Sequence, residues 1–433
     1  MRQVVTTLAA SCRRQDGIPL GIVTPDLPTD SEPTEDHQPN ERLILALAGA
    51  LLHSGTPAHR LENVLGAVAT SRGLHGTFFV VPTAVIAAFG PPGQQRSALV
   101  RSDPGWPDLG SVARLDEVVK EILDDRIPPG RARQIVADID NRPPSWPGWS
   151  VLLCFGLSSA ATAVFFGAGW AEIGIAGAVG LGLGLLEQLM RASGARFVFV
   201  PLAAGIGSFI AYAGQGIFGA YNPEVVTLAG LLYLLPGLTL TTALTELSGR
   251  HLASGTARLT FAALILFELA FGVGMGSSLG SRLVPSLAPI AHPVPGFVEP
   301  IALILVAVSF LGLFHARLKD ALVIIASCTL AFYAARVGAT LIGPQLGAAV
   351  GALLVALFCN GYARLFDRPP TVPLVPGILL LVPGSVGLRS MTRLLAHETV
   401  PAVDAAFEMT LIAISLAVGL LTANAILPPK RGL

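Results

Sequence analysis

One carboxyl group lies deep inside an apolar stretch of this 433-residue chain. Glu268 stands in the run 264–271, whose other members are all apolar. An ionised carboxylate in the middle of a membrane costs about 3 kcal/mol on insertion scales, so such a group is protonated, paired or in contact with water. A protonatable group near a substrate cavity is what proton coupling requires. We predict that Glu268 carries protons; a purely structural partner is the alternative.

Two Pro-Gly pairs interrupt apolar stretches at positions 147 residues apart, Pro236-Gly237 and Pro383-Gly384. Proline removes a backbone donor and glycine weakens a helix, so each pair is expected to break its helix. Broken helices are tolerated inside a membrane where the freed backbone groups meet protein, water or substrate. Corresponding breaks in two halves of a chain point to a transport site, whereas each pair alone is also consistent with a packing kink.

Hydroxyl groups follow both breaks. Thr239, Thr241 and Thr242 come after the first break, and Ser385 comes after the second. Hydroxyls and exposed backbone groups can bind a zwitterionic amino acid, although a single threonine is also explained by helix packing or by a bond to the preceding turn. The predicted substrate-binding residues are Pro236, Gly237, Thr239, Thr241, Thr242, Pro383, Gly384 and Ser385.

The elements that must position these residues are membrane helices. Residues 1–148 hold 31 of the 56 charged side chains, and residues 149–433 hold only 25, about 9% against about 25% in soluble proteins. This excludes a wholly soluble protein, and the balanced net charge gives no electrostatic reason for a nucleic-acid partner. Ten apolar stretches are long enough to cross a bilayer: 149–168, 172–190, 197–216, 225–246, 256–280, 297–314, 320–338, 340–358, 372–391 and 405–427.

The spacing of these stretches indicates a repeat. The first and sixth stretches begin 148 residues apart, close to the separation of the Pro-Gly pairs, so the chain reads as two halves of five helices, 149–280 and 281–433. Five is odd, and equivalent helices therefore cross in opposite directions as inverted repeats. Even-numbered connections and the two flanks carry 14 Lys and Arg residues, against 4 on the opposite side. The positive-inside rule then places both termini in the cytoplasm.

The part before these helices has ordinary soluble composition. Residues 1–40 are expected to form a disordered leader, and residues 41–148 a small cytoplasmic α/β (α+β) domain with its linker. Apolar residues at helical spacing predict helices within 43–52, 61–73, 115–122 and 132–139, and the β-branched run 77–88 predicts a strand broken at Pro82. We therefore expect a polytopic α-helical membrane protein preceded by this domain.

No motif for catalysis, a metal or a cofactor is found. His53, His59 and His75 match no ligand spacing, and no phosphate-binding loop or nucleophile elbow is present. We expect no enzymatic activity, no metal site and no cofactor.

Four strings resemble the threonine/serine exporter family. They are residues 51–62 with Pro82-Thr83, residues 233–244, the loop 250–258 and residues 381–390, in the family's order. The family's Gly-x-x-x-x-Arg-x-Glu string is intact as Gly55, Arg60 and Glu62, and Glu246 follows the threonines where the family often carries an acid. We favour a structural ion pair between Arg60 and Glu62 over a role in substrate binding.

The resemblance implies a ten-span carrier of the inner membrane that exports small hydroxy amino acids by proton antiport. We predict threonine and serine as substrates and protons as the coupling ion; a homo-oligomer is compatible with the sequence. One alternative is a dicarboxylate exporter, which related two-part systems suggest, although only Arg389 offers a fixed cation near a break. A less favoured alternative is a membrane-anchored sensor or enzyme acting through residues 41–148.

Overall fold

The computed structural model describes residues 38–102, 107–193, 198–284, 287, 293–382 and 384–429. Residues 39–433 belong to one compact unit. Residues 1–37 of the expected leader lie outside the described residues. Residues 38–40 belong to the first helix instead of the leader, since the helix that was expected near Leu43 begins at Gln38.

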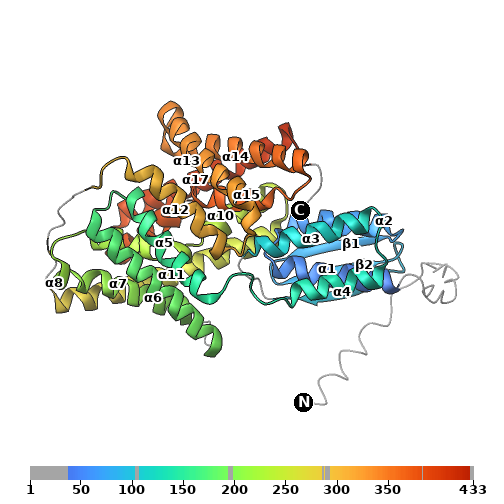
Figure 1. Ribbon diagram of the computed structural model, residues 1–433, viewed down its shortest axis with the longest axis horizontal. Helices are drawn as coiled ribbons and strands as arrows, with labels where there is room; N and C mark the ends of the chain where they lie inside the picture. Colours follow the sequence, from blue (N-terminus) through green and yellow to red (C-terminus); the bar gives the residue numbers. More distant parts are fainter. Residues whose placement is uncertain are drawn as a thin grey trace, which may run out of the picture. The chain divides into compact units, whose positions relative to one another are not determined.

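The α1–α4 segment, residues 38–140, combines four helices with a small sheet (Figure 1). Its elements are α1 (Gln38–His53), α2 (Ala58–Ser71), β1 (Gly76–Val81), β2 (Ala84–Phe89), β3 (Arg96–Arg101), α3 (Leu109–Leu123) and α4 (Pro129–Asp140). The apolar faces of α1 and α2 are fully buried in one core with β2, where Leu47, Leu61 and Val85 have no exposed surface. Gly55 makes the turn between α1 and α2 with φ +80, a conformation that glycine adopts at little cost.

The sheet corrects one expectation from the sequence. The single strand expected over residues 77–88 is a hairpin, in which β1 and β2 pair antiparallel with Val81 opposite Ala84. Pro82 and Thr83 form the two-residue turn. Proline cannot donate a hydrogen bond to a neighbouring strand, so the chain turns at this position more readily than it continues the strand. Strand β3, which pairs with β2, was not expected, since its exposed Arg and Ser residues are weak strand formers.

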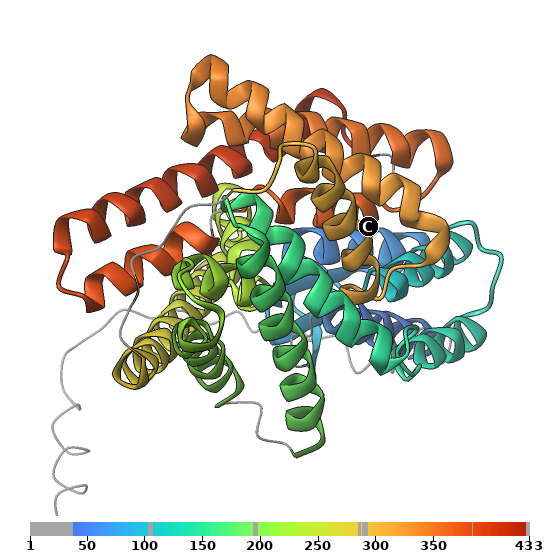
Figure 2. The same ribbon diagram turned by 60° about the vertical axis from the view of Figure 1, so that its left-hand side comes forward.

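The remaining elements are apolar helices. They are α5 (Gly148–Phe165), α6 (Trp170–Ser193), α7 (Phe199–Ala213), α8 (Gln215–Phe218), α9 (Pro223–Gly230), η2 (Leu232–Leu234), α10 (Gly237–Ser248), α11 (Leu252–Leu283), α12 (Val298–Leu313), η3 (Leu318–Asp320), α13 (Ala321–Ile342), α14 (Pro344–Phe366), α15 (Thr371–Leu379), α16 (Gly384–Leu395) and α17 (Thr399–Ile426). Figures 1 and 2 show α6, α7 and α11 below and α13 and α14 above, and in Figure 1 α10 lies between these two groups, beside α15 and α17.

The structure contains fewer helices of membrane-spanning length than the ten that the sequence predicts. Within the described residues, eight helices are long and apolar enough to cross a membrane, or nine if the pair α9 and η2–α10, bent by 53°, counts as one broken span. The sixth expected span corresponds to α12, whose 16 residues fall short of the roughly 20 that a bilayer requires. Each of the ten expected ranges overlaps an observed helix or broken pair, and the chain is a polytopic α-helical membrane protein.

Close helix packing relies on glycine. Gly272 and Gly276 of α11 face the backbone of α7 so closely that a Cβ at either position would overlap the carbonyl oxygens of Pro201 and Gly205. Small residues at such contacts let two helix backbones approach, which is how membrane helices gain packing energy without a hydrophobic effect between them.

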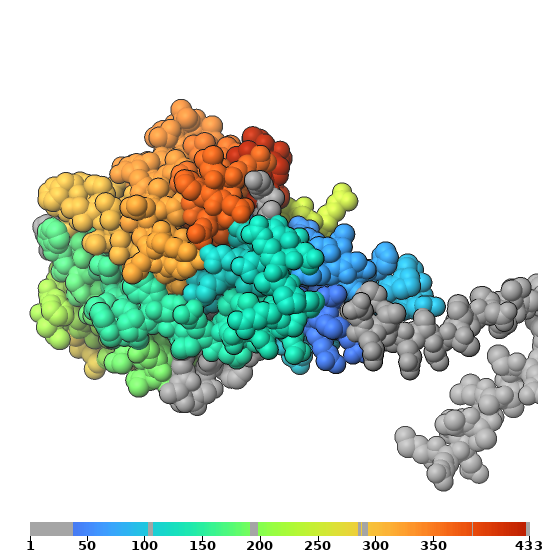
Figure 3. Space-filling view, turned by 45° about the vertical axis from the view of Figure 1, so that its right-hand side comes forward, coloured from blue at the N-terminus to red at the C-terminus, as the bar shows by residue number. Residues whose placement is uncertain are grey.

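The α1–α4 segment is held against both sets of helices (Figure 3). Trp146, just beyond it, donates its indole N–H to the carbonyl of Ala316 at 2.9 Å. Glu117 of α3 lies 3.0 Å from Arg317 and 2.5 Å from Arg368. Partial burial alone would raise the pKa of Glu117, but the hydrogen bond to Arg317 and the surrounding positive charges lower it below its ordinary value.

Candidate functional site

The two helix breaks, far apart in the sequence, meet in space. A Cβ placed on Gly237 would overlap Cγ1 of Val382 and would lie 3.4 Å from the backbone nitrogen of Gly384. A Cβ on Gly384 would lie 2.9 Å from the Cβ of Leu235 and 3.5 Å from the nitrogen of Gly237. Only glycine permits this approach, and the requirement explains both glycines better than helix flexibility does.

Two helices begin at this contact. Helix α10 starts at Gly237 and its first internal hydrogen bond runs from Leu240 N–H to the Pro236 carbonyl, while α16 starts at Gly384. The first N–H groups of a helix have no acceptor within that helix, and the helix dipole adds partial positive charge at the same end. The contact therefore gathers the donor-rich starts of two helices, an arrangement suited to an anionic group.

A cavity of about 140 Å³, called here the break cavity, opens beside these starts. It is smaller than the roughly 300–1,000 Å³ that drug-sized ligands occupy, so it fits a small solute. Gly237, Gly384 and Ser385 line it together with residues that the sequence did not single out: Thr162, Phe165, Phe166, Leu232, Leu235, Phe310, Phe332, Leu379, Leu380 and Val382.

The other residues predicted for substrate binding lie elsewhere. Pro236 is buried at the break, and Thr239, Thr241 and Thr242 lie further along α10, outside the lining of the break cavity. The Thr241 hydroxyl is buried and has no hydrogen-bond partner among the described residues. Pro383 lies outside the described residues.

Glu268 occupies a half-buried position in the middle of α11. Residues one or two turns away on the same helix face, Leu264, Phe271 and Met275, are more than half exposed at 52%, 62% and 51%. Within the described residues the Glu268 side chain has no hydrogen bond or ion pair, and it does not line the break cavity. The carboxyl therefore stands among apolar side chains on an outward-facing side of α11.

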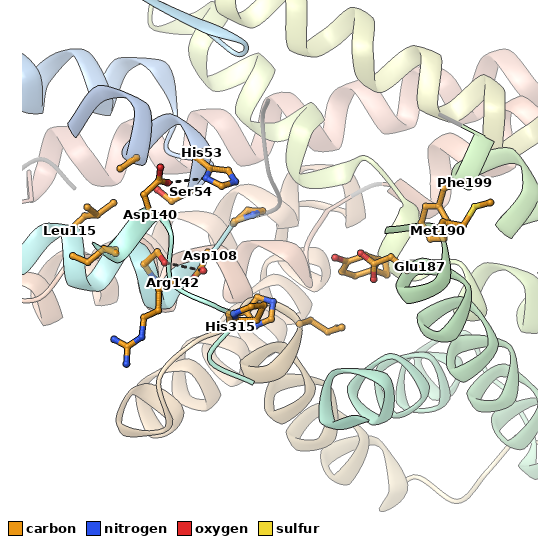
Figure 4. A pocket seen from close by; sticks show the side chains of 17 residues that line it. His53, Ser54, Asp108, Leu115, Asp140, Arg142, Glu187, Met190, Phe199 and His315 are labelled. Carbon is orange, nitrogen blue, oxygen red and sulfur yellow. Dashed lines mark hydrogen bonds and ion pairs between the residues drawn. The ribbon is translucent and has the colours of Figure 1, made fainter. Parts of the chain in front are cut away.

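A second cavity of about 460 Å³, the larger cavity, lies between the α1–α4 segment and the apolar helices. Figure 4 shows Glu187 reaching into it from α6, and on the opposite wall His53 paired with Asp140 at 2.9 Å. Tyr233 of η2 lines this cavity, whereas the adjacent Leu232 lines the break cavity. The short helix before the first break thus contributes to the walls of both.

The string Gly55 to Glu62 packs on the apolar helices. The Ala58 N–H at the start of α2 donates to Glu246 Oε1 at 2.9 Å. Glu246 is fully buried near the end of α10, and its other oxygen accepts from the Ser254 hydroxyl at 2.7 Å and from Arg258 Nε at 3.2 Å. A carboxylate at a helix start satisfies a backbone donor and complements the dipole, so Glu246 binds α2 to α10.

Arg60 and Glu62 do not form the expected ion pair. Among the described residues, the Arg60 guanidinium donates to the hydroxyl of Thr371 at the start of α15. Glu62 accepts from the Val80 N–H at 3.0 Å and pairs with His251 at 3.4 Å. The two side chains point apart because each contacts a different segment. Their spacing in the sequence does not determine which segments these are.

His59 lies in the same interface, with its ring 6.0 Å from that of His251. Burial, together with the nearby charges of Arg60, His251 and Arg258, lowers the pKa of His59 to about 3. His59 is therefore neutral at physiological pH. Across the described residues, no three His, Cys, Asp or Glu side chains are grouped to hold a metal ion.

Broken apolar helices that begin at one small cavity, within a set of membrane-length helices, are typical of a membrane transporter. Comparison with protein families agrees with this class. Residues 42–280 match the family described as "Putative threonine/serine exporter", and residues 300–426 match the one described as "Threonine/Serine exporter, ThrE". This chain belongs to the threonine/serine exporter family, which confirms the resemblance found in the sequence.

The individual relatives share about a quarter of their aligned residues with this chain. The chain is 27% identical over 431 residues to "Pheromone-regulated membrane protein 10" of Saccharomyces cerevisiae (strain YJM789), a match that covers 90% of this chain and 54% of the yeast protein. It is 26% identical over 373 residues to the protein of the same name from Candida albicans (strain SC5314 / ATCC MYA-2876), covering 81% of this chain and 33% of that protein. The chain thus spans about half of the first relative and a third of the second. No solved structure matches the chain.

Proposed function

We propose that this chain is a secondary active transporter that exports threonine and serine from the cytoplasm by proton antiport. In this proposal it lies in the cytoplasmic (inner) membrane with both termini and the α1–α4 segment on the cytoplasmic side, as the distribution of Lys and Arg supports. The halves 149–280 and 281–433 act as inverted repeats that move around the break cavity.

The observation that carries the proposal is the meeting of two helix starts at one cavity. The amino acid carboxylate binds the N–H groups at the starts of α10 and α16, beside Gly237 and Gly384. The Ser385 hydroxyl, which lines the same cavity, offers a further donor. The proposed binding set remains Pro236, Gly237, Thr239, Thr241, Thr242, Pro383, Gly384 and Ser385, with the three threonines reached as the halves move.

The charges around the cavity favour an amino acid over a dicarboxylate. Of the described side chains that line the break cavity, none is a cation. Arg389 lies with its guanidinium 5.7 Å from the centre of the Phe166 ring, outside the lining. A dianion buried here would lack a second counter-charge, which costs several kcal/mol.

Transport in liposomes tests the function directly. The purified chain, reconstituted and loaded with radiolabelled threonine, serine or succinate, is followed with and without an imposed pH gradient. We expect gradient-dependent movement of threonine and serine. Movement of succinate alone would transfer the function to a dicarboxylate exporter, and movement of none of the three would disprove transport of these substrates.

We propose Glu268 as the proton carrier, because an unpaired carboxyl in an apolar helix is most stable when it can take up a proton. Glu268→Gln keeps the shape and removes the titration, so we expect gradient-driven threonine transport to fall to the level without a gradient. Glu224→Gln, which alters an exposed carboxylate at the start of α9, is the matched control. Full gradient dependence in Glu268→Gln would show that the proton passes elsewhere.

A further inference from the structure

We propose that phenylalanine rings in the break cavity bind the ammonium group of the substrate through cation–π contact. The proposal rests on the proposed function and deepens it, because it names the part of the cavity that distinguishes an amino acid from other small carboxylates. The rings are those of Phe165 at the end of α5, Phe310 of α12 and Phe332 of α13.

The need for such a site follows from charge. The two helix starts provide for a carboxylate, but no carboxylate side chain is present among the described residues that line the break cavity. An ammonium group moved out of water requires a compensating interaction. The electron-rich face of an aromatic ring supplies one when the cation lies within about 6 Å of the ring centre.

The rings are fixed in place from both halves of the chain. Phe165 and Phe332 lie with their ring centres 5.1 Å apart, which joins the end of α5 to the middle of α13. Phe310 is only 1% exposed, and its ring packs 5.6 Å from that of Phe314. An aromatic wall held in this way loses little freedom when a ligand binds, which favours affinity. The Thr162 hydroxyl in the same lining provides an acceptor for an ammonium N–H.

A neighbouring ring already has a cation over its face. The Arg389 guanidinium carbon lies 5.7 Å from the centre of Phe166, a residue of the same cavity lining. Arg389 stands one helical turn after Ser385 on α16. A cation and an aromatic ring are thus in contact at the edge of the break cavity, within the distance at which the attraction is significant.

A series of fluorinated phenylalanines at position 332 tests the proposal in the full-length chain. One, two and three fluorine atoms withdraw electrons from the ring face step by step, while the side chain stays nearly the same size. We expect the KM for threonine to rise with each fluorine, by about tenfold over the series, since a cation–π contact of this strength corresponds to that change. Phe89, which is buried in the core of the α1–α4 segment and does not line the cavity, is the matched position, and its series should leave KM unchanged.

Analogues that lack the amino group provide the second measurement. Inhibition by 3-hydroxybutyrate, the des-amino form of threonine, should be weak in the native chain and should not change along the Phe332 series. A flat KM series for threonine in a chain that transports threonine would overturn the aromatic site and leave the proposed function intact. A native chain that transports no threonine would overturn both.

Discussion

The buried hydroxyl of Thr241 is the most unusual single group near the first break. Its side chain is only 2% exposed, yet the hydroxyl has no partner among the described residues. Threonine in a helix ordinarily bonds to the carbonyl four residues earlier, as Thr245 does to the Thr241 carbonyl at 2.8 Å. An unsatisfied buried hydroxyl lowers stability, so a functional contact in another state of the transporter is a reason for its presence.

Thr241→Val separates the effect of this hydroxyl on stability from its proposed role in substrate binding. Valine fills the same space without the hydroxyl, and we expect the melting temperature to stay the same or rise, by the equivalent of about 1 kcal/mol at most. If the hydroxyl contacts substrate as proposed, the KM for threonine rises in the liposome assay. Thr245→Val is the control, since its hydroxyl bonds locally. An unaltered KM would remove Thr241 from the binding set.

Gly237 is the residue with the least room for a side chain at the contact between the breaks. We expect Gly237→Ala to destabilise the folded chain by about 1–3 kcal/mol, because the added methyl group overlaps Val382 and the two helix starts must separate. Thermal unfolding in detergent measures the loss. Gly182→Ala on α6, where no atom lies within 4 Å of the new Cβ, should leave the melting temperature unchanged or slightly higher. Equal stability of both variants would contradict the close contact.

At the scale of elements, the short helix α10 joins the break to the α1–α4 segment. Its 12 residues begin at Gly237 beside the break cavity and end just beyond Glu246, which binds the start of α2. Helix α15 has a corresponding position, since Thr371 at its start contacts Arg60 of α2 and its other end leads into the second break. The start of α2 therefore contacts the end of α10 and the start of α15, which are the ends of these helices away from the breaks.

The contact of Glu246 can be tested by comparing two substitutions. Glu246→Ala leaves Arg258 and the Ala58 N–H without their partner, and removing one member of a buried pair costs about 3–5 kcal/mol. Glu246→Gln keeps an acceptor for the N–H, so we expect a smaller loss. Hydrogen exchange at the first turn of α2 should rise in the same order, and exposed Glu121→Gln on α3 should change neither measurement. Unchanged exchange in Glu246→Ala would show that α2 is held elsewhere.

At the scale of the whole molecule, the distribution of charge predicts the orientation in the membrane. With ten spans, Lys and Arg would concentrate on one side of the helices, which is the cytoplasmic side in most membrane proteins. We expect Ser97→Cys in β3, in a chain without its native cysteines, to react with a membrane-impermeant thiol reagent only after cells are permeabilised. Ser281→Cys, near the C-terminal end of α11, lies on the side that is predicted to face away from the cytoplasm and should react in intact cells. The reverse pattern would invert the proposed topology and the direction of export.

Much of the architecture was predictable because it depends on local properties. Apolar stretches of bilayer length, and the tendency of Pro-Gly to break a helix, are read directly from neighbouring residues, and each expected span overlaps a helix or broken pair of the structure. Pro376-Gly377, which continues inside α15, shows that the pair alone does not decide where a helix ends. The same holds for the helices of the α1–α4 segment, whose buried faces recur at helical spacing. The sequence predicted one strand where the structure has the hairpin β1–β2, because the run 77–88 has strand-forming residues throughout apart from one proline.

Sequence by itself determined the class of protein, its apolar spans and the places where two helices break. Only the tertiary structure decided that Gly237 meets Gly384, that phenylalanines of α5, α12 and α13 complete the cavity, and that Glu246 binds the start of α2. The physical reason is that a helix in lipid is apolar on both its buried and its exposed faces. Its sequence pattern therefore does not show which side faces a partner helix, and contacts between distant segments emerge only when the helices pack.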